Sequence, residues 1–147
     1  MNDIVVNKVQ SIQRCIERAS EEYCSAGTNF PTDYTRQDAA VLNITRACEQ
    51  AIDLANFLIK THKMGIPTSS GESFTLLARK HVIPSALEEK MRSMVGFRNV
   101  AVHEYRKLDI DIVEAVIRTG LNDLLAFTDH VVKYLKNSNL ISPPQSL

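Results

Sequence analysis

Residues 98–105, which read RNVAVHEY, bring together side chains suited to phosphate chemistry. The reactive positions within this segment are Arg98, Asn99, His103 and Tyr105. An imidazole has an unperturbed pKa of about 6.5, so near neutral pH it can take a proton from a ribose 2′-hydroxyl or give one to a leaving oxygen. A guanidinium stays charged and binds two phosphate oxygens at once, which stabilises a phosphoryl transition state. Arg98 and His103 together therefore indicate metal-independent cleavage of RNA.

Arg98 also interrupts an apolar pattern. The helix expected to begin at Pro84 directs one stripe inward, formed by Leu87, Met91 and Met94. The next positions of this stripe are Arg98 and, seven residues later, Tyr105. Burial of a guanidinium lowers stability unless the group is paired, so we expect Arg98 to line a cleft or an interface. The structural alternative is an Arg whose aliphatic stem covers the core while its charged end reaches water. Asn99 and His103, one turn apart, add a second polar strip beside the same groove.

The charge of the chain is balanced overall but uneven along its length. Seventeen Lys and Arg residues face seventeen Asp and Glu residues, so no global positive field attracts nucleic acid. The segment 79–107 nevertheless has seven basic and three acidic residues, which gives it a charge of +4 and leaves −4 for the rest. This distribution predicts local binding of a polyanion near Arg98 and His103.

The elements that position these residues are predicted to be helices. The chain has 147 residues, 44% apolar and 23% charged, as is usual for one globular domain. Apolar residues recur at steps of three and four, the spacing of an amphipathic helix. The expected helices cover residues 4–24, 35–63, 69–83, 84–105 and 109–135. We therefore predict an all-α fold, an up-and-down bundle of four long helices plus a short extra helix, with one domain over residues 1–136 and a flexible C-terminal tail over residues 137–147.

Capping residues mark three of the expected helix starts. Thr35 followed by Asp38, and Ser69 followed by Glu72, have the spacing of a capping box. Asp109 is the expected cap of the last helix. These caps predict where the helices on either side of the 98–105 segment begin.

The segment 94–109, which reads MVGFRNVAVHEYRKLD, resembles the signature of the HEPN superfamily, and specifically the R-x4-H-x-Y motif of HepT-like ribonuclease toxins. Residues 46–59 (RACEQAIDLANFLI) are similar to the long second helix of that family, and residues 69–77 to its short connecting helix. The N-terminal helix and the tail match nothing diagnostic. Asp53 resembles an acidic position of the long helix, but we interpret it as an exposed surface carboxylate outside the site.

The resemblance implies a homodimer in which both copies of Arg98 and His103 occupy a shared cleft. By the same resemblance Arg98 and His103 are the catalytic pair, Asn99 supports the motif, and the substrate is RNA, with tRNA the favoured class. Tyr105 matches the tyrosine that a cognate minimal nucleotidyltransferase antitoxin modifies with AMP to silence the toxin. An attached nucleotide would add bulk and negative charge where the RNA phosphate must lie; Tyr105 as a packing aromatic is the structural alternative.

Other function classes have weaker support in the sequence. A non-catalytic helical module that partners a nucleotidyltransferase is the main alternative, because fold resemblance does not determine activity. The four histidines at positions 62, 81, 103 and 130 show no metal-ligand spacing, and no nucleophile elbow accompanies any Ser or Cys. Three cysteines without a C-x-x-C pair, and the lack of a long apolar run, favour a cytoplasmic protein that needs no membrane, metal or cofactor.

Overall fold

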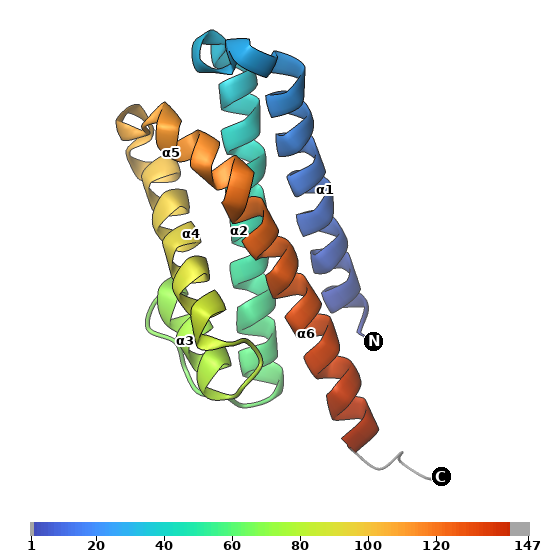
Figure 1. Cartoon of the computed structure of the whole chain (residues 1–147). Helices are drawn as coiled ribbons and strands as arrows, with labels where there is room; N and C mark the ends of the chain where they lie inside the picture. The colour runs from blue at the N-terminus through green and yellow to red at the C-terminus, as the bar shows by residue number, and fades with distance from the viewer. Residues whose placement is uncertain (1, 142–147) are drawn as a thin grey trace.

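All regular secondary structure of residues 2–141, the part of the chain that the computed structural model describes, is helical (Figure 1). The α-helices are α1 (Asp3–Ala26), α2 (Tyr34–Thr61), α3 (Ser70–Arg79), α4 (Ser85–His103), α5 (Ile110–Ala115) and α6 (Leu121–Ile141). Two 3₁₀ turns, η1 (Gly27–Thr32) and η2 (Tyr105–Lys107), and one π-helical segment, η3 (Val116–Gly120), connect some of them. The predicted bundle is confirmed: α1, α2, α4 and the α5–α6 unit are its four long members, and α3 is the short one.

The second helix, α2, is the centre of the bundle because its apolar face is wide enough to meet several neighbours. It packs against α1 along much of its length and also contacts α3, α4 and α6. Its buried side chains include Ile44, Cys48, Leu54 and Leu58, which face different sides of the helix. In Figure 1, α6 crosses the bundle diagonally, in contact with α1, α2 and α4. As a result α2 and α4 lie next to each other, which decides the geometry of the site.

Two of the three predicted helix starts are correct and one is wrong. Ser69 caps α3, since its Oγ accepts a hydrogen bond from the Glu72 amide at 3.1 Å. Asp109 caps α5 by accepting from the amide of residue 111 at 2.8 Å. The second helix, however, begins earlier than expected: Asp33 is its cap, accepting from the amide of residue 36 at 3.1 Å. Asp38 therefore lies inside α2, where its carboxylate is free for a tertiary contact.

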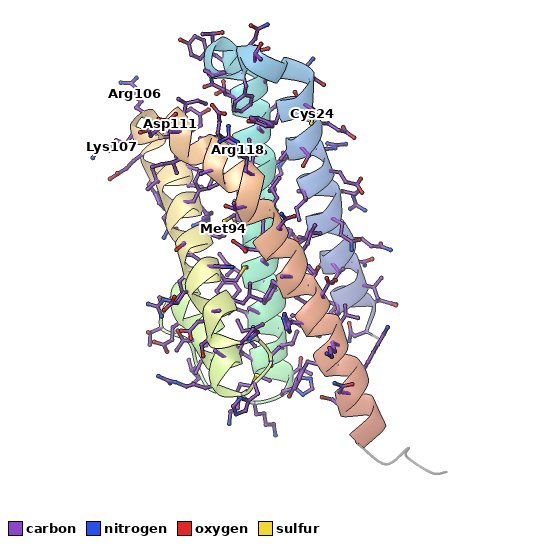
Figure 2. The ribbon with its side chains drawn as sticks, in the orientation of Figure 1. Cys24, Met94, Arg106, Lys107, Asp111 and Arg118 are labelled. Carbon is purple, nitrogen blue, oxygen red and sulfur yellow. The ribbon has the colours of Figure 1, made fainter. Side chains whose placement is uncertain are left out.

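The last predicted helix contains a π-helical segment that the apolar periodicity does not indicate. Backbone angles stay helical from α5 through η3 into α6, so the three segments form one continuous unit. A Cβ built on Gly120 would lie only 2.8 Å from the Met94 sulfur, so glycine permits this close approach to α4 (Figure 2). The unit continues to Ile141, so the helix extends beyond the predicted domain end at residue 136. The rest of the predicted tail, residues 142–147, lies outside the described part of the chain.

One aromatic pair in the interior of the bundle should contribute strongly to the stability of the fold. Phe74 of α3 and Phe127 of α6 are both fully buried, and their rings meet edge to face at 5.3 Å. Phe127→Ala should lower the free energy of unfolding by about 3–5 kcal/mol, because it removes this contact and leaves a cavity. Urea denaturation measures the change, with Ile66→Ala as the control, since Ile66 is 88% exposed. Equal stability of the two variants would show that α6 is not packed as described.

Candidate active site

Arg98 lies on the side of α4 that faces α2, and its guanidinium is only partly satisfied. Its Nη1 donates to Asn99 Oδ1 at 3.1 Å, and its Nε lies 4.0 Å from Glu49 Oε1 of α2, an ion pair too long for a hydrogen bond. The side chain is 26% exposed, yet Nε is buried and has no acceptor among the described residues. A buried donor without an acceptor is unfavourable, so the guanidinium is not fully satisfied by the described residues of one chain.

His103 is the last residue of α4, and its imidazole is exposed. No hydrogen bond or ion pair joins it to another residue in the 2–141 range. Arg98 and His103 are five residues apart on one helix, which separates them by about 140° around the axis and about 7.5 Å along it. Asn99 and Val102 lie between them on the same outer face of α4, and both are exposed. Within a single chain, therefore, the two predicted catalytic side chains point in different directions.

Tyr105 contacts α2 from outside the helix that carries the rest of the motif. Because α4 ends at residue 103, Tyr105 lies in η2 and does not continue the apolar stripe as predicted. Its hydroxyl donates a hydrogen bond to Asp38 Oδ1, and the side chain remains 45% exposed. Partial burial, the hydrogen bond to Asp38 and the charge of that carboxylate together raise the pKa of Tyr105 to about 12. At neutral pH the phenol is consequently protonated.

The hollow beside Tyr105 has a volume of about 260 Å³ and lies between α2 and α4. It is lined by Asp38, Val41, Leu42, Thr45, Ala101, Val102 and Tyr105. Arg98 and His103 do not line it, so the predicted common groove is not formed by one chain. Leu42 and Val102 are each nearly half exposed, at 48% and 47%. We call the surface formed by Leu42, Asn99, Val102, His103 and Tyr105 the outer α2–α4 face.

Two acidic residues of α2 are part of this arrangement although the motif does not include them. Asp38 and Glu49 are eleven residues apart, or three turns, so both lie on the side of α2 that faces α4. Asp38 meets Tyr105 and Glu49 meets Arg98, which shows that α2 and α4 run antiparallel here. Their helical spacing is visible in the sequence, but nothing there indicates which face of α2 meets α4. Asp53, by contrast, pairs with Lys8 of α1 at 3.3 Å, outside the site as interpreted.

The basic residues of the segment 79–107 are partly neutralised by acidic partners. Lys107 lies 3.5 Å from Glu104, and Lys90 lies 3.8 Å from Asp123. Arg106 forms no ion pair with any residue in the described range, and Figure 2 shows it projecting with Lys107 from the end of the bundle where α4 meets α5. Positive charge is thus available to a polyanion close to His103, although less of it than the sequence count indicates.

Metal-ligand clusters and helices able to span a membrane are both absent from the described residues. Across residues 2–141, no three His, Cys, Asp or Glu side chains are grouped so that they could hold a metal ion. None of the described helices is both long and apolar enough to cross a membrane. The functional groups that α4 and η2 place beside α2 are the guanidinium of Arg98, the amide of Asn99, the imidazole of His103 and the phenol of Tyr105.

Comparisons with known proteins identify the family. The family described as ribonuclease HepT-like matches residues 12–131. The mRNA nuclease HepT of Shewanella oneidensis is 45% identical over 129 residues, which cover 88% of this chain and 96% of that protein. The solved structure of the tri-AMPylated Shewanella oneidensis HEPN toxin in complex with MNT antitoxin has a TM-score of 0.86 at 43% identity, covering 90% of this chain and 99% of that one.

A more distant structure shares the fold alone. YutE, a cytosolic protein of unknown function from Bacillus subtilis, has a TM-score of 0.74 at 16% identity, over 96% of both chains. The family match and the 45% identity, in contrast, confirm the resemblance carried by the R-x4-H-x-Y motif. The chain therefore belongs to the ribonuclease HepT-like family and is a ribonuclease of that family.

Proposed function

We propose that this protein is a metal-independent endoribonuclease toxin whose active site is shared by two copies of the chain. The observation that carries the proposal is that α4 bears both an Arg98 whose Nε has no acceptor among residues 2–141 and, five residues later, an exposed His103. Arg98 would bind the phosphate and His103 would move protons, while Asn99 holds the guanidinium through its 3.1 Å hydrogen bond. The family membership supports the same chemistry.

The angular separation of Arg98 and His103 is the reason for placing the site between two copies. Since the two side chains diverge by about 140° on one helix, Arg98 of one copy works with His103 of the other when two α4 helices face each other. Two imidazoles then share one cleft. Within each Arg98–His103 pair the imidazole accepts the proton of the attacking 2′-hydroxyl and, once protonated, gives a proton to the leaving oxygen, while the guanidinium stabilises the negative charge on the phosphoryl oxygens.

Association of two copies through the outer α2–α4 face is directly testable. Val102→Glu places a charge at the centre of this face, so we expect the dimer to dissociate and RNA cleavage to fall with it. Light scattering measures the mass in solution, and the same sample is assayed for cleavage. Ile66→Glu, which introduces the same charge at an 88% exposed position, should change neither. A Val102→Glu protein that stays dimeric and active would place the contact between copies elsewhere.

The substrate is tested with purified protein, a chelator and two classes of RNA. The tRNA indicated by the sequence resemblance and the mRNA named for the Shewanella relative are compared at equal concentration. We expect cleavage with EDTA present. Mass spectrometry of the same sample must show Tyr105 without an attached group. If such unmodified protein cleaves neither RNA, the chain is the non-catalytic helical module that was the main alternative, and the enzymatic proposal fails.

We further propose that a cognate minimal nucleotidyltransferase antitoxin silences the toxin by attaching AMP to Tyr105. The Shewanella toxin is described as tri-AMPylated in its complex with MNT antitoxin, which supports this type of control. Tyr105 is accessible and lies at the edge of the outer α2–α4 face, two residues after His103. The phosphate of an attached nucleotide would repel the RNA backbone, and its bulk would obstruct the cleft.

Removal of the Tyr105 hydroxyl separates toxicity from its control. We expect Tyr105→Phe to keep cleaving RNA but to remain active after incubation with the antitoxin and ATP, because phenylalanine offers no oxygen for transfer. Tyr134→Phe on α6 is the matched control and should be silenced as the parent protein is. Equal silencing of Tyr105→Phe would mean that the modified residue is a different one or that the antitoxin blocks the cleft without modifying it.

A further inference from the structure

The contact between Asp38 and Tyr105 joins two segments that are far apart in the sequence. Asp38 lies in the second turn of α2, where Asp33 already caps the helix, so its carboxylate has no local structural role. Its Oδ1 accepts a hydrogen bond from the Tyr105 hydroxyl, and both residues line the hollow between α2 and α4. The carboxylate oxygen is therefore hydrogen-bonded to Tyr105 Oη, the atom to which the proposed modification attaches AMP.

We propose that Asp38 is the proton acceptor for nucleotide transfer to Tyr105, an inference that rests on the proposed modification of that hydroxyl. Tyr105 Oη attacks the α-phosphorus of ATP and forms a new O–P bond. The bridging bond between the α- and β-phosphates breaks, and pyrophosphate leaves with the electron pair. The hydroxyl proton passes to Asp38 Oδ1 and from there to water. Carboxylates accept hydroxyl protons in the same way in other phosphoryl and nucleotidyl transfers.

The reaction needs such an acceptor because the phenol ionises poorly where it is held. With a pKa of about 12, roughly one molecule in 10⁵ carries the phenolate at pH 7. Attack by the neutral hydroxyl must therefore be accompanied by removal of its proton. Asp38, which adds to the effect of burial in raising this pKa, is also the group in position to receive the proton, since its carboxylate is already the acceptor of the hydrogen bond.

Among residues 2–141, no ionisable side chain other than Asp38 and Tyr105 lines the hollow. Besides Asp38 and Tyr105, its lining consists of Val41, Leu42, Thr45, Ala101 and Val102. On the segment that carries Tyr105, the flanking charged residues are Glu104 and Arg106, and the carboxylate of Glu104 is paired with Lys107 at 3.5 Å. Among the described residues, the proton of Tyr105 accordingly has one acceptor within hydrogen-bond distance.

Single-turnover transfer from ATP, catalysed by the antitoxin and followed by intact mass, tests the inference. We expect Asp38→Asn to slow transfer to Tyr105 by about 10²-fold, because an amide keeps the shape and a hydrogen-bond acceptor but cannot take up the proton. Asp53→Asn removes the same charge from the same helix at a site paired with Lys8, and it should leave the rate unchanged. Tyr105→Phe provides the blank, and peptide mapping verifies the modified residue.

The pH dependence of transfer separates proton removal from simple positioning. Below the phenol pKa, the rate for Asp38→Asn should rise about tenfold per pH unit, because this variant must use the rare phenolate. The parent rate should change little between pH 6.5 and 8.5, because in the parent protein Asp38 takes up the proton of the neutral phenol during attack. A slow variant with a flat profile, or a variant as fast as the parent, would overturn the role of Asp38. A parent protein that gains no AMP on Tyr105 would overturn the proposed modification, and this inference with it.

Discussion

Replacement of His103 by Ala is expected to lower the rate of RNA cleavage by about 10²–10⁴-fold, the range that a positioned general acid or base contributes. The imidazole is exposed and makes no hydrogen bond within residues 2–141, so its removal should leave folding intact. His81→Asn is a suitable control. His81 is also exposed, and its positive φ of 60° is a conformation that Asn tolerates. Single-turnover cleavage of labelled RNA measures both variants beside the parent protein.

The pH profile of the parent protein gives a second measure of the same role. An imidazole changes its charge between pH 5 and 8, so a rate that depends on it must vary across that interval. A flat profile would mean that another group transfers the proton. Retention of more than a tenth of the parent activity by His103→Ala would lead to the same conclusion, and would direct attention to a water molecule or to a group supplied by the RNA.

Replacement of Arg98 should have a comparably large effect. We expect Arg98→Ala to reduce cleavage by about 10²–10³-fold, since it removes a preformed donor from the position where charge develops. Arg98→Lys should recover only part of this loss, because lysine keeps the charge but cannot bind two phosphate oxygens at once. Folding should be little affected, because the buried Nε has no acceptor to lose and the Glu49 contact is long.

A second arginine on the same helix serves as the control that separates the specific position of Arg98 from a general effect of positive charge. Arg92→Ala removes one positive charge from the same helix, at a site that is 53% exposed and 3.9 Å from Glu88. Because screening weakens interactions between exposed charges, it should reduce cleavage less than tenfold. Parallel losses in Arg92→Ala and Arg98→Ala would indicate that only the overall field matters. Full activity of Arg98→Lys would show that a point charge replaces the guanidinium.

The helices were predictable from the sequence because each has its own amphipathic stripe and its own start or stop signals. Ser69 and Asp109 cap as their spacing predicts, and α1 ends directly before Gly27. The start of α2 was misplaced because Thr35 and Asp38 imitate a capping box within the helix, whereas Asp33 provides the actual cap. The π-helical segment, whose last residue Gly120 lies close to Met94, leaves no mark on the local apolar period.

The candidate site was predictable in its residue types but not in its contacts. The motif predicts Arg98, Asn99 and His103 as site residues, and the structure joins the first two by a hydrogen bond. Asp38 and Glu49 were missed because their roles depend on which face of α2 meets α4, a property of the packed bundle. The common groove was predicted within one chain because a helical stripe was extended past residue 103, where the helix ends.

Mixing two variants, each of which lacks one residue of the catalytic pair, tests the shared site most directly. Arg98→Ala subunits keep His103, and His103→Ala subunits keep Arg98, so a mixed dimer holds one intact pair drawn from different subunits. Random exchange of equal amounts gives mixed dimers as about half of the population. We predict that RNA cleavage, which is about 10²-fold or more below the parent rate in either variant alone, rises on mixing in proportion to the mixed dimers that native mass spectrometry detects. Mixed dimers that form and remain inactive would contradict a site built from two copies of the chain.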